Sequence, residues 1–172
     1  VAAQEWVGAG GAIDMFTAVA VDIDEVAVEV ASKNFAAAPW SERMSITQSS
    51  FAEWAADASN AAFGFDVCLC NPPYTHSSST SQQQRKGSAA TKLTRRRAME
   101  RDFMPLTVVF ESAERLKCRE VWVLWGNDED EPVVSAARAS GWQPLSITRF
   151  WRSARAGMPF ATVWRMAPRD VK

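Results

Sequence analysis

Short apolar runs that end in polar or turn-forming residues recur along the chain, with amphipathic stretches between them. The clearest run is 67–70, which leads straight into Asn71, Pro72 and Pro73. An unbroken apolar run this short predicts a strand buried on both faces of a parallel sheet. Proline donates no ladder hydrogen bond, so we expect the strand to end before Pro72.

The rest of the pattern predicts further strands and helices in alternation. Strands are expected at 18–21, 44–48, 120–125, 145–151 and 160–166, and helices at 25–33, 52–56, 103–116 and 128–140. Such alternation predicts an α/β fold, and the last two strands are expected to form an antiparallel pair. In the first helix, Val26 and Val30 are expected on the core side. A chain of 172 residues fits one domain, which we predict over 1–172.

The turn after run 67–70 carries groups that suit a flat, amine-bearing target. The Asn71 side-chain oxygen and the Pro72 carbonyl can each accept one N–H bond of an NH₂ group, and Tyr74 can stack on a planar group. The motif from Asn71 to Tyr74 resembles the catalytic motif of S-adenosylmethionine-dependent amino-methyltransferases, which methylate adenine N6 or a glutamine amide. The resemblance implies Asn71, Pro72 and Tyr74 as catalytic residues, and Asn71 also as a contact of the cofactor S-adenosylmethionine.

Two other predicted strand ends carry candidate cofactor residues. Asp22 follows the strand at 18–21 and resembles the acid that accepts hydrogen bonds from the cofactor's ribose hydroxyls, while Asp24 is better placed to cap the next helix. Ser50 stands where the related enzymes have an acid beside the cofactor's adenine, and Phe51 follows it. The resemblance implies cofactor contacts from Asp22, Ile23, Ser50 and Phe51.

One branch of this family is most similar, on the segment Asn34-Phe35 followed by Pro39-Trp40 and Arg43. That branch is the bacterial enzymes that methylate N6 of an adenine beside the anticodon of a valine tRNA. The implied fold is a Rossmann-like class I methyltransferase sheet, mostly parallel, with an antiparallel C-terminal strand pair. The implied activity is N6-adenine methylation of structured RNA, tRNA above all.

The glycine cluster at 8–11 is not the expected cofactor loop, because only residues 12–17 separate it from the next apolar run. A βαβ unit needs a whole helix between its glycine loop and the following strand. We therefore predict that the chain is a fragment that lacks the first strand and its glycine loop.

The composition changes after Tyr74, and we predict a mobile basic substrate loop over 75–101. The net charge is −1, so any attraction to nucleic acid must be local. Basic side chains supply most of the salt-sensitive affinity for RNA. A cluster of basic residues also occurs simply as the solvated face of a helix. The predicted RNA contacts are Arg85, Lys86, Arg95, Arg96, Arg97 and Arg101.

The remaining features concern the cellular location of the protein, and two alternative functions stay open. The cysteines at 68, 70 and 118 form no metal or disulfide pattern, and no apolar stretch is long enough for a membrane span, so we predict a cytoplasmic protein without metal or membrane partner. A protein-glutamine N5 methyltransferase of the release-factor type would use the same turn. A non-catalytic RNA-binding remnant would explain Ser50 in place of an acid.

Overall fold

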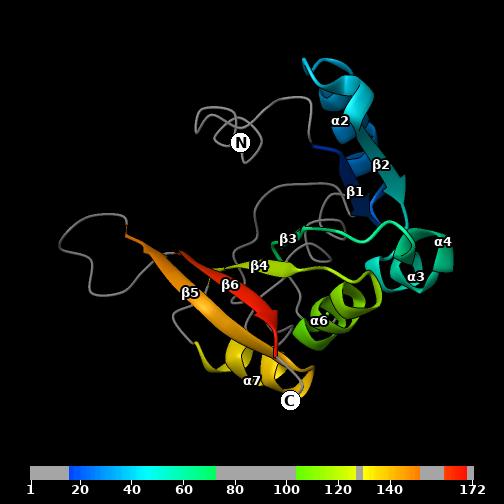
Figure 1. The fold of residues 1–172 in the computed structure, drawn as a ribbon. Coiled ribbons are helices and arrows are strands. Elements are labelled where there is room, and N and C mark those ends of the chain that lie inside the picture. Colours follow the sequence, from blue (N-terminus) through cyan, green and yellow to red (C-terminus); the bar gives the residue numbers. More distant parts are fainter. Residues whose placement is uncertain (1–15, 73–103, 127–129, 152–160, 170–172) are drawn as a thin grey trace, which may run out of the picture. The chain divides into compact units, whose positions relative to one another are not determined.

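The computed structural model describes residues 16–72, 104–126, 130–151 and 161–169 (Figure 1). These residues fall into two compact units, divided after Phe51, and each unit is described by itself. The first holds β1 (Ala18–Asp22), α2 (Glu25–Ala36), the 3₁₀ helix η2 (Ser41–Arg43) and β2 (Met44–Gln48). The helix α3 (Phe51–Ala56) begins at the boundary, and the second unit continues with α4 (Ala58–Ala61), β3 (Val67–Cys70), α6 (Leu106–Arg115), β4 (Glu120–Trp125), α7 (Glu131–Ala139), β5 (Trp142–Phe150) and β6 (Ala161–Pro168).

The first unit is a βαβ arrangement, in which the parallel strands β1 and β2 are joined through α2. The Asp24 side chain accepts hydrogen bonds from the backbone N–H of Val26 at 2.9 Å and of Ala27 at 3.0 Å. The predicted N-cap is therefore confirmed, and it satisfies two of the donors that a helix start leaves unpaired.

The predicted core face of α2 is wrong. Val26 is 62% exposed and Val30 is 51% exposed, whereas Ala27, Ala31 and Phe35 are half-buried. Positions spaced by four lie above one another on a helix, so the inner face is rotated by one residue from the expected one. Periodicity alone does not separate two neighbouring rows of apolar residues on the same helix.

The second unit is built on a four-stranded sheet in the order β3-β4-β6-β5. The strands β3 and β4 are parallel, while β6 is antiparallel to both β4 and β5. The expected antiparallel pair is confirmed, with β5 starting at Trp142 rather than at 145. The insertion of β6 between β4 and β5 was not predicted, because strand order depends on long-range pairing.

One face of this sheet carries the core of the second unit. Along β4 the alternate residues Val121, Val123 and Trp125 are fully buried, and the apolar face of α6 adds Phe110, whose ring centroid lies 6.1 Å from that of Trp142. The helices α6 and α7 pack on each other, and α7 packs against β5. The buried residues of this core are Leu106, Val109, Phe110, Ala113, Leu116, Val121, Val123, Trp125, Val133, Ala137, Trp142, Trp164 and Met166.

The strand at 67–70 was predicted to be buried on both faces, and this is wrong within the second unit, where one face of β3 is exposed. Val67 is 40% exposed and Leu69 is 59% exposed. The reason is the register, because Leu69 lies beside Trp122, itself 37% exposed, while Cys70 lies beside the buried Val123. β3 is an edge strand of its sheet, so only its cysteine face reaches the core.

The cysteines of this unit are free thiols in or near that core. The Cys68 thiol is hydrogen-bonded to the Cys118 sulfur, and this bond together with burial raises the Cys68 pKa. Burial raises the pKa of Cys70 to about 12. A raised pKa keeps the Cys68 and Cys70 thiols protonated and unreactive at neutral pH, whereas the same hydrogen bond with Cys68 lowers the pKa of Cys118.

The other face of the sheet carries an ion-pair network between β4 and β6. Glu120 accepts hydrogen bonds from the Trp122 indole N–H at 2.8 Å and from Arg165 Nε at 2.6 Å, and it also pairs with Arg165 Nη2. The Arg165 guanidinium lies 5.9 Å from the centroid of the Trp122 ring. These bonds hold the pKa of the Glu120 carboxyl at about 2, below its ordinary value of 4.5.

This network predicts how stability changes with pH. A carboxyl whose pKa is lower in the folded chain stabilises it fully above its ordinary pKa, and the contribution is lost as the pH falls from about 5 towards 2. We expect Glu120→Gln to remove this part of the acid sensitivity, so that its melting temperature depends less steeply on pH between 5 and 2.5. Glu114→Gln, at an exposed position of α6, serves as control and should retain the wild-type slope. Equal slopes for the wild type and Glu120→Gln would contradict the role of the network.

Candidate functional site

The first unit gathers the predicted cofactor residues at one edge of its strand pair. Asp22 lies opposite Gln48 in the parallel register, so β1 and β2 end side by side. The Ser49 N–H donates to the Asp22 carbonyl at 3.0 Å and ties the two strand ends together. As a result Asp22 ends β1, and Ile23, Ser50 and Phe51 follow the carboxyl ends of these two adjacent parallel strands. This edge is where open α/β sheets bind ligands.

The Asp22 carboxylate is exposed but held in place. Its Oδ1 accepts the Asp24 N–H at 2.8 Å, which fixes the orientation of the side chain. A carboxylate has about four lone-pair positions, so the group keeps the capacity to accept two hydroxyl donors. Ile23 beside it is 57% exposed and offers an apolar contact at the same edge. The arrangement fits a ligand that presents a diol next to a flat apolar group.

The second unit places the predicted catalytic turn at the end of β3. Asn71 is exposed, whereas Pro72 is among the fully buried side chains of the described chain. Proline fixes its own φ, and the burial of its ring restricts the movement of the turn. The consequence is an amide side chain that faces solvent from a stiff support, as a hydrogen-bond acceptor for a ligand requires.

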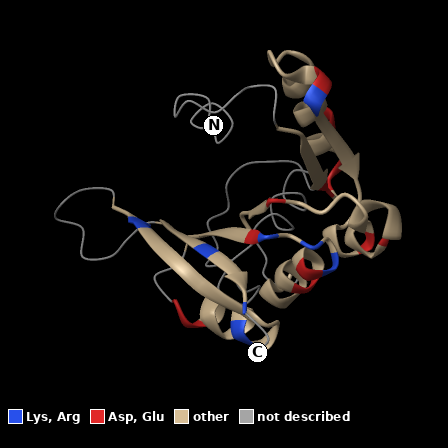
Figure 2. Ribbon diagram, viewed as in Figure 1, with Lys and Arg blue, Asp and Glu red and all other residues tan. Residues whose placement is uncertain are grey.

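Several predicted site residues lie outside the described residues. These are Tyr74 and the basic residues Arg85, Lys86, Arg95, Arg96, Arg97 and Arg101. Within the described part of the second unit, acidic and basic residues are interspersed along the elements (Figure 2). The local basic surface that the sequence predicts would therefore have to come from residues 75–101.

Sequence reasoning missed a group of residues at the same edge of the sheet as Asn71. Arg149 and Phe150 end β5, and Trp151 follows them. Arg149 forms an ion pair with Asp130, the N-cap residue of α7. The sequence signal was the aromatic pair at the end of a predicted strand. Its place relative to Asn71 follows only from the strand register.

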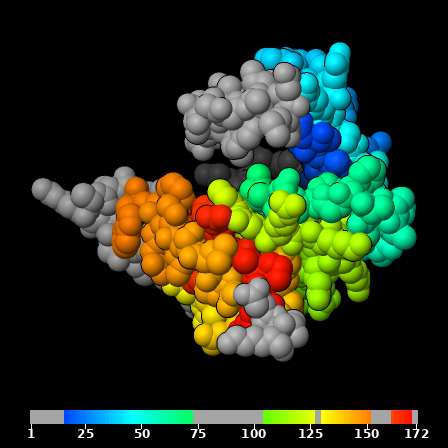
Figure 3. Space-filling model, viewed as in Figure 1, coloured from blue at the N-terminus to red at the C-terminus, as the bar shows by residue number. Residues whose placement is uncertain are grey.

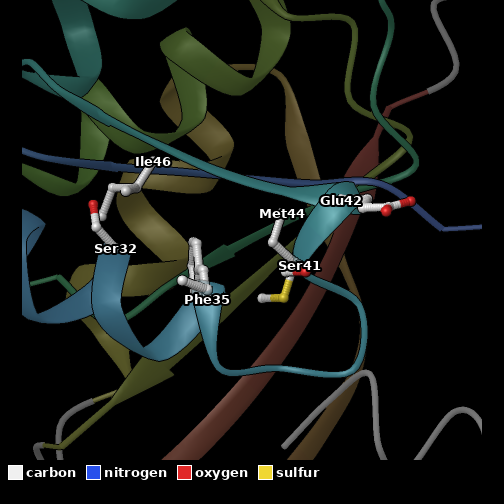
Figure 4. Close-up of a pocket in the computed structure, with 7 residues that line it drawn as sticks. Ser32, Phe35, Ser41, Glu42, Met44 and Ile46 are labelled. Carbon is white, nitrogen blue, oxygen red and sulfur yellow. The ribbon is translucent and has the colours of Figure 1, made fainter.

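A hollow of about 500 Å³ lies within the first unit, lined from α2, η2 and β2 (Figure 4). Its lining includes Phe35, Met44 and Ile46 together with Ser32 and Glu42. None of the predicted cofactor residues contributes to it, because it lies towards the amino-terminal end of β2. We assign it no role in the site.

No group of three or more His, Cys, Asp or Glu side chains in the described ranges is arranged to hold a metal ion. None of the helices described is both long enough and apolar enough to cross a membrane.

The chain is similar in sequence to bacterial tRNA1(Val) (adenine(37)-N6)-methyltransferases. It is 29% identical to the protein from Flavobacterium psychrophilum over 133 residues, which is 76% of this chain and 51% of that protein. It is 33% identical to the protein from Shewanella sediminis over 70 residues, which is 40% of this chain and 29% of that protein. The chain thus spans about half, or less, of these curated relatives. No family model matches it.

Solved structures of methyltransferases share the fold. Sp1610 of Streptococcus pneumoniae, a candidate tRNA (m1A22) methyltransferase, aligns with a TM-score of 0.57 at 14% identity, over 98% of this chain and 59% of that one. The catalytic domain of hMettl16, solved in complex with the MAT2A 3′UTR hairpin 6, aligns with a TM-score of 0.51 at 14% identity, over 98% of this chain and 60% of that one. The fold is therefore the Rossmann-like methyltransferase fold that the sequence predicted.

Proposed function

We propose that the chain is the methyltransferase domain of an S-adenosylmethionine-dependent enzyme that methylates adenine N6 in structured RNA, tRNA above all. The observation that carries the proposal is the exposed Asn71 on the buried Pro72, at the carboxyl end of a parallel strand in this fold. The similarity to tRNA1(Val) (adenine(37)-N6)-methyltransferases supports both the reaction and the class of substrate.

The chemistry assigned to Asn71 and Pro72 follows from the weakness of the nucleophile. An exocyclic amine on a purine shares its lone pair with the ring, so it attacks poorly until its N–H bonds are polarised. The Asn71 Oδ1 and the Pro72 carbonyl can accept these two N–H bonds, which orients the lone pair and raises its electron density. The two acceptors would act with little reorganisation, because Pro72 is buried and its ring fixes its φ. Tyr74 is proposed to stack on the adenine.

The cofactor is proposed to lie along the strand ends of the first unit. Asp22 would accept hydrogen bonds from the ribose hydroxyls, Ile23 and Phe51 would contact the adenine ring, and Ser50 would bond to its edge. When bound, S-adenosylmethionine supplies the electrophilic methyl group. Ser50 is a weaker partner than the acid found here in the resembled enzymes, since bonds to a charged acceptor are the stronger ones.

Substrate RNA is proposed to be bound partly by the basic residues of 75–101, because phosphate contacts supply most of the affinity for RNA. The target adenine has to leave any stack to reach Asn71. The release-factor alternative is disfavoured by the tRNA methyltransferase relatives. Ser50 in place of an acid favours the alternative of a non-catalytic RNA-binding domain.

We also propose that both units belong to one domain, completed by a further strand. β3 is the edge of its sheet, with Val67 and Leu69 exposed, although a parallel sheet is normally buried on both faces. A strand added at that edge, with the helix that follows it, would cover these residues. This is the place that the predicted first strand and its glycine loop would take.

The test of the proposed function is methyl transfer by the full-length protein. Incubation with tRNA and S-adenosylmethionine, followed by nuclease digestion and mass spectrometry, should yield N6-methyladenosine. A transcript in which the adenine beside the anticodon is replaced by guanine should remain unmodified. Methylation of a release-factor glutamine in place of RNA would favour the alternative enzyme, and transfer to neither, with tRNA still bound, would favour the non-catalytic one.

A further inference from the structure

The strand register of the second unit brings the end of β5 to the edge of the sheet that carries Asn71. Cys70 lies beside Val123 in the parallel pair, so β3 and β4 end together. Trp125 and Arg149 both lie beside Thr162, one on each side of β6. The carboxyl ends of β3, β4 and β5 therefore share one edge, and residues that follow these strands face the same ligand region.

Two large aromatic residues are exposed at this edge. Phe150 is 43% exposed and Trp151 is 47% exposed, whereas Trp125, Trp142 and Trp164 of the same unit are at most 2% exposed. The core at this level holds the buried Trp125 and Thr162, and Thr162 lies between Trp125 and Arg149 in the register. Phe150 and Trp151 thus lie beyond the core, and Figure 3 shows the atoms of β5, in orange, at the surface.

The end of β5 is held firmly enough to present these rings. Arg149 pairs with Asp130 at the start of α7, and α7 packs against β5. Phe150 is aligned with Ala161 at the start of β6, so it belongs to the two-stranded part of the sheet. A ring presented from a strand loses little conformational freedom when a ligand stacks on it.

We propose that the rings of Phe150 and Trp151, here called the platform, offer stacking surfaces to unpaired bases that flank the target adenine. The proposal rests on the proposed function, since it assumes an RNA target at Asn71. Aromatic rings bind any base through its flat face, and stacking one base changes the affinity by about 5- to 140-fold. An exposed ring pair beside the reaction site suits the single-stranded or looped RNA that a base-modifying enzyme must hold open.

The spacing between the platform and Asn71 suits a base a few nucleotides away. Three strand intervals separate β3 from β5 in the order β3-β4-β6-β5, which is about 14 Å at 4.7–4.9 Å per interval. A stacked strand rises about 3.4 Å per nucleotide, so about four stacked nucleotides, or fewer when unstacked, cover this distance. The platform would therefore bind a nucleotide in the same loop as the target adenine.

The test compares Trp151→Ala and Phe150→Ala with the wild type in the full-length protein, by steady-state methylation of a tRNA transcript. The expected result is a rise in the KM for tRNA of about 5- to 140-fold for Trp151→Ala, with kcat within about twofold and the KM for S-adenosylmethionine unchanged. Trp151→Phe keeps a flat ring and should recover most of the affinity. Phe63→Ala is the matched control, because Phe63 is 76% exposed but precedes β3 at the opposite edge.

The outcomes separate this proposal from the proposed function. Wild-type protein that methylates no RNA would overturn the proposed function and the platform with it. Wild-type protein that methylates tRNA, with an unchanged tRNA KM in Trp151→Ala, would overturn the platform alone. An equal rise in KM for Phe63→Ala would also count against it. If Phe150→Ala does not fold, as judged by its thermal melt, the comparison of Trp151→Ala with Trp151→Phe still tests the platform.

Discussion

Replacing Asn71 by alanine is expected to lower methyl transfer to tRNA by the full-length protein at least about 100-fold, while the affinity for S-adenosylhomocysteine stays within about twofold. The expected size follows from the cost of removing one preorganised polar partner of a reacting group, about 10²–10³ in kcat. Asn71 is exposed directly after β3, whereas the proposed cofactor residues Asp22 and Ser50 lie at the ends of other strands. The measurements are initial rates of N6-methyladenosine formation and calorimetric titration with S-adenosylhomocysteine.

Two further variants test whether the activity lost in Asn71→Ala is due to the missing side-chain oxygen. Asn71→Asp keeps an oxygen acceptor in nearly the same volume, so it should retain more activity than Asn71→Ala. Asn34→Ala changes an exposed asparagine on α2 and should leave the rate unchanged. Methyl transfer by Asn71→Ala at a rate close to that of the wild type would remove the proposed acceptor role.

The second large effect is expected in the core, where Phe110→Ala should lower the free energy of unfolding by about 3–5 kcal/mol. Phe110 is fully buried on α6, and its ring contacts Trp142 at a centroid distance of 6.1 Å. The change removes the buried ring and leaves a cavity between α6 and β5. The free energy of unfolding of an ordinary domain is about 5–15 kcal/mol, so the variant would lose a large share of its stability.

Urea denaturation followed by circular dichroism measures this effect, and Phe63→Ala is the control. Phe63 is 76% exposed in the same unit, so its replacement should change the unfolding free energy by less than about 0.5 kcal/mol. A similar loss in both variants would mean that the Phe110–Trp142 contact is not a centre of the core.

The success of the sequence-based prediction varied with how local each feature is. The Asp24 cap, the strand at 18–21, which extends to Asp22, and the end of β3 before Pro72 were confirmed. Each depends on residues within one turn of helix or a few positions of strand, so periodicity and proline chemistry suffice. The exposed Asn71 follows from the same local stop, because a strand that ends at a buried proline leaves the residue before it at the rim of the sheet.

Features that depend on distant pairing were missed or were wrong. The inner face of α2 was placed one residue off at Val26 and Val30, and β3 was expected to be buried on both faces. In both cases the apolar pattern fits more than one packing arrangement. Which side chains are buried depends on the elements that pack beside the helix or strand. The basic residues of 75–101 and Tyr74 lie outside the described residues, so their roles stay predictions.

The sequence by itself determined the α/β alternation, the strand ends and the short motif at Asn71, because each depends only on residues close together in the sequence. The tertiary structure alone decided that β6 lies between β4 and β5. That order places Phe150 and Trp151 at the edge that carries Asn71, although they lie far along the chain from it. The physical reason is that strand pairing is fixed by backbone hydrogen bonds and packing between segments remote in sequence, which no local periodicity specifies.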